Sequence, residues 1–327
     1  MNTTAGTPDP RIIAPVQFDR VPWRRVGLFM LLSYGLFVPF AAPFWFLPGG
    51  IHHPLYQPVI AVGMWMPALA SLIMAKAVEK TSWRTRVGLR FRGRWKRLLV
   101  WTPVAAIVVA AIQVLCAVIM VLRGVPGDLS GRTGLGLYAK ALTDQMQTDV
   151  TPGLALAVLL VSTVSGFVVT ILFTLGEEIG WRGWLWPALK PLGRVRAAVV
   201  GGAIWSLWHL PIMIIGHNYP GWNRPAAIAM FLLPCMAMFL LFGALTDRAG
   251  GNPIPAAAAH SAVNTLSSAP IILVATAGTS AAVNLALDTL LGATGIVLLV
   301  IAGAAIMPWR RTPTADPAPA RVASEHG

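Results

Sequence analysis

Six polar side chains interrupt the apolar second half of the chain, and together they have the chemistry of a hydrolytic site. They fall in the stretches TLGEEIGWRGW, AIWSLWHLP and AAAAHSAVN and are Glu177, Glu178, Arg182, His209, His260 and Asn264. Titratable groups in hydrocarbon are costly, so they are rare there and generally face the interior of a bundle. A carboxylate, two imidazoles and an amide can activate water and stabilise an oxyanion. The set indicates an enzyme rather than an inert membrane protein.

Helix geometry gives the two neighbouring carboxylates different partners. In a helix Glu178 and Arg182 are i,i+4 neighbours and can pair, whereas Glu177 is turned about 100° away. Glu177 is then free to act as a general base. The alternative is an ordinary surface ion pair at the start of a cytoplasmic helix.

The two histidines have simpler interpretations when each is taken alone. His209 lies among tryptophans and fits a core position, while His260 and Asn264 lie four apart on one helical face and fit an interhelical hydrogen bond. Because three separate stretches each supply a compatible group, the sequence favours one shared site.

Composition predicts an all-α polytopic membrane protein. The 327 residues are 56% hydrophobic and 11% charged, with a mean hydropathy of +0.68, whereas soluble domains average about 25% charged residues. Cys116 and Cys235 lie inside apolar runs, so neither suggests a disulfide or zinc framework, and both are expected to have packing roles. The net charge of +13 is attributed to loops on the cytoplasmic side rather than to a nucleic-acid partner.

Eight apolar stretches are long enough to span a bilayer. They are predicted at about 26–48, 56–78, 98–122, 153–175, 197–216, 226–246, 253–276 and 285–307. They form a bundle with a polar intramembrane cavity, and this membrane domain (26–307) lies between an N-terminal arm (1–25) and a disordered tail (308–327). Prolines within the spans are tolerable where neighbouring helices bind the freed carbonyls; they are Pro39, Pro67, Pro103, Pro211 and Pro234.

The distribution of basic residues predicts the orientation. With eight spans, 21 of the 25 Lys and Arg residues fall on the side that holds both termini, and four fall on the other. The positive-inside rule then puts both termini in the cytoplasm, in what we expect to be a bacterial inner membrane. The basic loop 76–97, which contains Trp83 and Trp95, is expected to be a positive-inside anchor or to lie on anionic headgroups.

The three stretches resemble the signatures of the CPBP family, the CAAX-protease and bacteriocin-processing group of intramembrane proteases. EEIGWR resembles EExxxR, HSAVN matches HxxxN, and WSLWH is similar to FxxxH with Trp205 in place of Phe. Their order and spacing agree over roughly residues 150–275, which identifies a type II CAAX endopeptidase-like protein. The resemblance implies roles for each position: water activation by Glu177 and His209, an oxyanion site from His260 and Asn264, and support of the first motif by Glu178 and Arg182.

A zinc-dependent and a metal-free mechanism could both use these residues. The family is often labelled metalloprotease, and Glu177, His209 and His260 could hold Zn²⁺ with an open fourth position. The chain has no HExxH helix, and near the histidines the sequence offers Ser206, Ser261 and Asn264 but no further acidic residue to orient a ligand. We therefore predict a metal-free site with no cofactor, and keep zinc as the alternative.

The predicted function is hydrolysis of a peptide bond in a membrane-associated peptide or protein near the cytoplasmic face. The alternatives are a non-catalytic scaffold or immunity-type membrane protein and a small-solute transporter. Transporters often have two matched halves, and residues 1–150 contain no second EE/H/H/N set. Neither a prenylated substrate nor an oligomeric state follows from the sequence.

Overall fold

Every regular element in the described part of the chain is helical, which confirms an all-α polytopic membrane protein. The computed structural model describes residues 18–219 and 221–309. Most of the predicted N-terminal arm (1–25) and nearly all of the predicted disordered tail (308–327) therefore lie outside the described residues.

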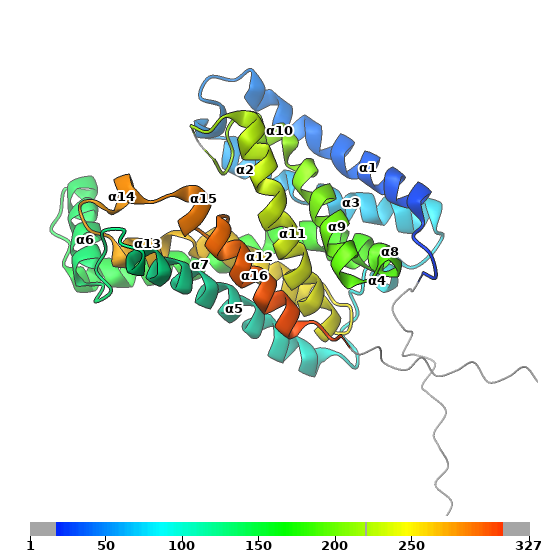
Figure 1. Cartoon of the computed structure of the whole chain (residues 1–327). Helices are drawn as coiled ribbons and strands as arrows, with labels where there is room; N and C mark the ends of the chain where they lie inside the picture. Colours follow the sequence, from blue (N-terminus) through cyan, green and yellow to red (C-terminus); the bar gives the residue numbers. More distant parts are fainter. Residues whose placement is uncertain (1–17, 220, 310–327) are drawn as a thin grey trace, which may run out of the picture.

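Nine helices make up most of the bundle (Figure 1). They are α1 (Trp23–Ala41), α2 (Tyr56–Gly63), α3 (Met66–Ile73), α5 (Trp95–Leu122), α7 (Pro152–Glu178), α9 (Arg194–Trp208), α11 (Arg224–Arg248), α12 (Ile254–Leu266) and α16 (Ala293–Ile306). The other α-helices are α4 (Trp83–Arg86), α6 (Arg132–Met146), α8 (Trp186–Leu189), α10 (Leu210–Met213), α13 (Ser268–Val274), α14 (Thr279–Ala282) and α15 (Leu285–Asp288). Three 3₁₀ turns and two π-helical segments connect them: η1 (Ala42–Trp45), η2 (Gly50–His52), η5 (Lys190–Leu192), η3 (Met74–Val78) and η4 (Ile179–Leu185).

The predicted count of eight spans is wrong by one. Within the described residues, seven helical segments are long and apolar enough to cross a membrane. The remaining stretch, 197–216, is divided between the 15-residue α9 and the four-residue α10, with His209 between them. Fifteen helical residues rise about 22 Å, less than the roughly 30 Å of hydrocarbon. Pro211 accounts for the break because it has no N–H to bond the carbonyl of Leu207.

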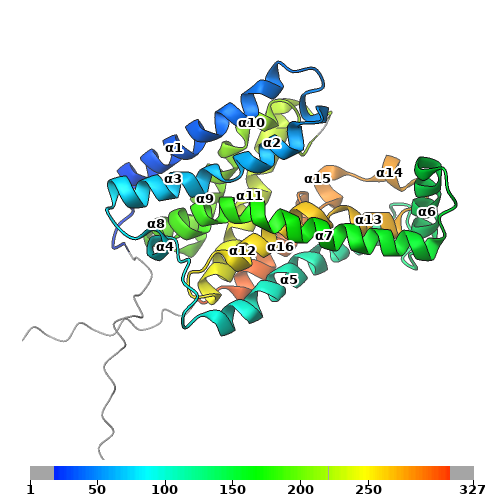
Figure 2. The same cartoon turned by 180° about the vertical axis from the view of Figure 1, so that it is seen from behind.

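The two ends of the described chain lie at the same end of the bundle. The start of α1 and the end of α16 are both found there, together with α4, α8 and the start of α5 (Figures 1 and 2). We call this the basic end, because it includes the basic loop 76–97. The grouping agrees with the side to which the charge count assigns the termini, although the orientation in a membrane remains a prediction.

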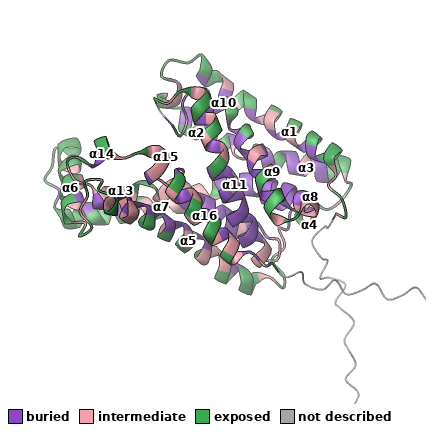
Figure 3. Ribbon diagram, viewed as in Figure 1, coloured by how far each residue is buried: buried purple, intermediate pink, exposed green. Residues whose placement is uncertain are grey.

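Helix α11 is the centre of the bundle. It packs against α9, α16 and α12, and α12 in turn packs against α5 and α7. Most of α11 is buried, whereas α1, α5 and α7 present long exposed faces (Figure 3). Close approach of α9 to α11 depends on Gly202, because a Cβ there would lie 2.4 Å from the Cα of Met236. The three motif stretches belong to the elements that meet here, namely α7–η4, α9 and α12.

Candidate active site

The first motif lies where α7 passes into the π-helix η4. Glu177 and Glu178 end α7, and all seven residues of Ile179–Leu185 are buried. π-Helical turns are rare and are frequent at functional sites. Gly180 lets this segment touch the start of α3, because a Cβ there would lie 2.4 Å from Cβ of Pro67. The motif is therefore held deep in the bundle rather than at a surface.

Glu178 binds two basic side chains at once. Arg182 Nη1 lies 2.9 Å from each carboxylate oxygen and donates to Oε1, so the predicted i,i+4 pair is confirmed and its surface alternative is wrong. His260 Nδ1, from α12, lies 2.9 Å from the same Oε1. Glu178 and Arg182 are both fully buried. A carboxylate with two charge-assisted partners fixes the position of α12 relative to η4.

Aromatic rings enclose the rest of the Arg182 guanidinium. Its Cζ lies 4.4 Å from the ring centroid of Trp205, 4.3 Å from Phe239 and 4.8 Å from Phe242. Desolvated cation–π contacts of this kind contribute about 2 kcal/mol or more. They compensate in part for Nε and Nη2, which have no hydrogen-bond partner within the described residues.

Glu177 has a different environment, made of neutral donors. Its Oε2 accepts a hydrogen bond from Trp205 Nε1 at 2.8 Å and a longer one from Trp181 Nε1 at 3.3 Å. The side chain is 2% exposed. No cation pairs with this carboxylate in the described part of the chain, in contrast to Glu178. The predicted division between a paired and a free carboxylate therefore holds geometrically.

His209 caps the end of α9 and has its tautomer fixed by the backbone. Its Nδ1 lies 2.9 Å from the carbonyl oxygen of Trp205. Because a carbonyl can only accept, Nδ1 carries the proton, and in the neutral ring Nε2 keeps its lone pair. The ring also packs against Phe231 and Trp208. His209 and Glu177 do not hydrogen-bond to each other; each contacts Trp205.

Trp205 contacts four of the six motif residues, a role that the motifs did not predict. Its indole binds Glu177, its carbonyl binds His209, its ring covers Arg182, and the ring lies 5.2 Å from that of His260 in an edge-on contact. A Phe at this position would lack the N–H. The sequence offered a signal, because Trp replaces Phe in the second motif. The sequence also offered a signal for Trp181, the second donor to Glu177, because the two residues are four positions apart.

Asn264 stands apart from the other five predicted residues. It is exposed, whereas His260, one turn earlier on α12, is 5% exposed. Its side chain makes no hydrogen bond with any described residue. Neither of the two main pockets of the described chain is lined by the motif side chains, so the predicted polar cavity is not among them.

The residues do not fit a preformed metal centre as they are placed. Within residues 18–219 and 221–309, no three His, Cys, Asp or Glu side chains are arranged to hold an ion. Nothing supports the metalloprotease label, and we derive no step through a metal. One premise of the metal-free prediction is nonetheless wrong: His260 does have an acidic partner, Glu178, which is the kind of contact that orients metal-bound histidines. Metal dependence therefore stays a prediction.

Comparison with known proteins agrees with the motifs. Residues 154–266 match the family described as type II CAAX prenyl endopeptidase Rce1-like. The matched segment makes up the centre of the chain. It begins in α7, ends with α12, and contains all six motif residues and Trp205.

A curated relative gives a shorter match to the same family. A 44-residue stretch is 36% identical to CAAX prenyl protease 2 of Methanococcus maripaludis. The match covers 13% of this chain and 16% of that protein. The family match thus covers only the centre of the chain, and helices α1–α6 and α13–α16 lie outside it.

Proposed function

We propose that the protein is an intramembrane endopeptidase acting on a membrane-associated peptide or protein near the cytoplasmic face. The family match supports an intramembrane endopeptidase in general. The observation that carries the finer proposal is the convergence of α7–η4, α9 and α12 on Trp205, which gathers an unpaired carboxylate and two oriented imidazoles in a buried setting. Such a setting strengthens electrostatic interactions with a reacting group.

In the proposed reaction Glu177 is the general base. It takes a proton from water while the water oxygen attacks the peptide carbonyl carbon, forming a tetrahedral oxyanion. The C–N bond then breaks, and the leaving amine takes up the proton from Glu177. His209, with Nδ1–H held by the carbonyl of Trp205, presents Nε2 to the water and orients it.

His260 and Asn264 are assigned to the oxyanion. The His260 Nδ1–H is directed at Glu178, so a donor at Nε2 requires the doubly protonated ring, which then lies against the Glu178 carboxylate. Asn264 would reach the oxyanion from the exposed side of α12. Glu178 and Arg182 are positioning residues in this scheme, because they hold His260 and η4.

Activity of the purified protein on a peptide library in detergent tests the proposal. We expect cleavage by the wild type, no cleavage by Glu177→Ala, and no effect of a chelator. Absence of peptide cleavage by folded wild type, or full activity of the variant, would contradict it. Elemental analysis of active protein separates the mechanisms: about one zinc per chain, with activity lost to chelator and restored by Zn²⁺, would overturn the metal-free reaction.

A further inference from the structure

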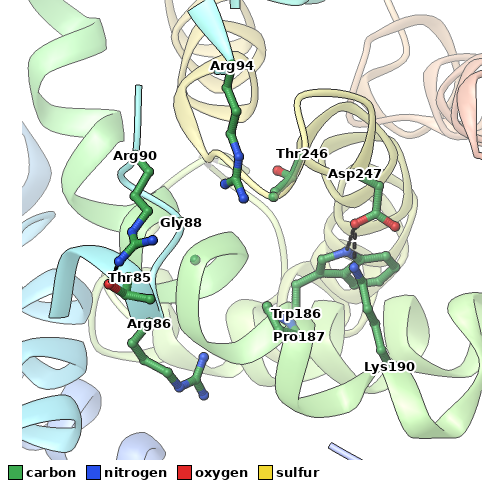
Figure 4. A pocket seen from close by; sticks show the side chains of 12 residues that line it. Thr85, Arg86, Gly88, Arg90, Arg94, Trp186, Pro187, Lys190, Thr246 and Asp247 are labelled. Atoms are coloured by element: carbon green, nitrogen blue, oxygen red, sulfur yellow. Dashed lines mark hydrogen bonds and ion pairs between the residues drawn. The ribbon is translucent and has the colours of Figure 1, made fainter. Parts of the chain in front are cut away.

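A second polar site lies at the basic end, and the proposed peptidase reaction does not use it. We call it the basic pocket. Its lining includes the cations Arg86, Arg90, Arg94 and Lys190 and a single acidic residue, Asp247. In Figure 4, Arg94 enters between Arg90 on one side and the Lys190–Asp247 pair on the other.

The carboxylate of Asp247 already has hydrogen-bond and ion-pair partners within the protein. Asp247 Oδ1 lies 2.6 Å from Lys190 Nζ and 3.1 Å from Trp186 Nε1, and Arg194 Nε lies 3.7 Å from the second oxygen. Arg86 is likewise accounted for, because it is buried and its Nε lies 2.8 Å from Oε2 of Glu79. Neither Asp247 nor Glu79 therefore neutralises the remaining arginines.

Among the described residues, Arg90 and Arg94 have no acidic partner. Arg90 donates to the neutral hydroxyl of Thr85 at 2.6 Å, and the side chain of Arg94 makes no hydrogen bond or ion pair with any described residue. Burial lowers the pKa of Arg94, and the charges of Arg90 and Arg97 lower it further. Three like charges near one pocket create a positive potential that a bound anion relieves.

The pocket also lies beside the ends of three candidate membrane spans, the level at which lipid headgroups are expected. Arg94 immediately precedes the candidate span Trp95–Leu122. Asp247 is the next-to-last residue of the span Arg224–Arg248, and Lys190 lies two residues before the end of Pro152–Leu192. Trp95, next to Arg94, is exposed, as expected of an aromatic side chain at the membrane interface. Phosphates of the bilayer are concentrated at this level.

We propose that the basic pocket binds the phosphate of an anionic membrane phospholipid through Arg90 and Arg94. The planar guanidinium group donates in a fork that suits phosphate oxygens, and basic pockets between helices at a cytoplasmic face recognise such headgroups. The choice of a lipid over a soluble phosphate rests on the position of the pocket where three spans end. The proposal does not depend on the peptidase assignment.

Thermal unfolding of the purified full chain in detergent provides the test. Phosphatidylglycerol, phosphatidylcholine and inorganic phosphate are titrated separately into the wild type, Arg94→Gln and Arg92→Gln. Arg92 is the matched control, because it belongs to the same loop and is exposed but does not line the pocket. Arg94→Lys keeps the charge but removes the guanidinium group, and it replaces Arg94→Gln in the titration if that variant does not fold. Native mass spectrometry counts the bound lipid directly.

We expect phosphatidylglycerol to raise the Tm of the wild type and Arg92→Gln equally, because a ligand bound only to the native state stabilises it. Arg94→Gln should lose at least half of the shift, and the other two additives should have no effect. An equal loss in Arg92→Gln would reduce the effect to general surface charge and overturn the proposal. An inorganic-phosphate shift as large as that of the lipid would overturn the lipid assignment, and no shift in the wild type would overturn the site.

Discussion

The two halves of the segment from α7 to η4 have nearly opposite environments despite their continuity. In the first half the side chains of Val161, Val164 and Leu172 are exposed, and Val168 is 58% exposed. In the second half the run from Gly176 to Trp186 is buried throughout. The exposed half is apolar because its solvent is lipid, and the buried half contains the charges because protein surrounds them. In this segment the charged residues lie in the protein interior.

A finer comparison separates the two neighbouring carboxylates of the buried half. Glu178 is held by Arg182 and His260, whereas Glu177 is held by two neutral indoles. The ion pair with Arg182 and the contact with His260 make Glu178 part of the framework. Among the described residues Glu177 has only neutral hydrogen-bond partners, which is the basis for proposing that it accepts the proton in the reaction. The contrast supports the proposal that Glu178 is structural and that Glu177 is the general base.

Glu178→Gln should have the largest effect on stability. Removing one member of a buried pair costs about 3–5 kcal/mol because the other charge is left unpaired. The matched control is Asp144→Asn, which removes an exposed i,i+4 partner of Lys140, also at 2.9 Å; exposed pairs contribute about 0–1 kcal/mol. Unfolding in detergent measures both. Equal and small losses of stability in Glu178→Gln and Asp144→Asn would contradict the structural role of Glu178.

Asn264→Ala should lower kcat by about 10²–10³ with a smaller change in KM, as for removal of a single oxyanion donor. Steady-state kinetics on a peptide that the wild type cleaves provides the measurement. Because Asn264 is exposed, its loss should leave the unfolding temperature unchanged. A change in KM alone would instead make Asn264 a substrate-binding residue.

Trp205→Phe should lower kcat about tenfold while KM stays within about twofold, since hydrogen bonds to charged groups contribute about 1.5–3 kcal/mol and part of this is retained through Trp181. An aromatic ring over Arg182 is retained, but ring volume is lost together with the N–H, so a control with the same loss of volume is needed. Trp208→Phe is the control, because that indole donates to the carbonyl of Ser33 rather than to a motif residue. Equal losses of kcat in both variants would count against a specific contact with Glu177.

Two glycines on the same segment test the contrast between its halves. Gly180→Ala should destabilise by about 1–3 kcal/mol, because overpacking displaces the neighbour at Pro67. Gly166→Ala should be neutral or slightly stabilising, because its Cβ would meet only Thr265 Cγ2 at 3.9 Å and Ala favours helix. Thermal unfolding compares the two. Similar values would mean that the two halves are packed alike.

Local features were predictable from the sequence, and long-range contacts were not. The Glu178–Arg182 pair follows from four-residue spacing alone, and the apolar runs predicted seven of the spans correctly. The contact between Glu178 and His260 joins residues 82 positions apart and depends on how α12 packs against α7. The stretch 197–216 was wrongly predicted as a span because hydropathy does not show the helix break that Pro211 causes at His209. The shared role of Trp205 depends on side-chain directions from four elements.

The most direct test of the central claim is the activity of Glu177→Gln beside its thermal stability, measured on the same purified sample. The substitution keeps the shape of the side chain and removes the base. We expect turnover of a membrane-associated peptide to fall by at least about 10²–10⁴, the usual contribution of general base catalysis, with the unfolding temperature nearly unchanged. A folded Glu177→Gln protein that cleaves the peptide at the wild-type rate would contradict the assignment of the site.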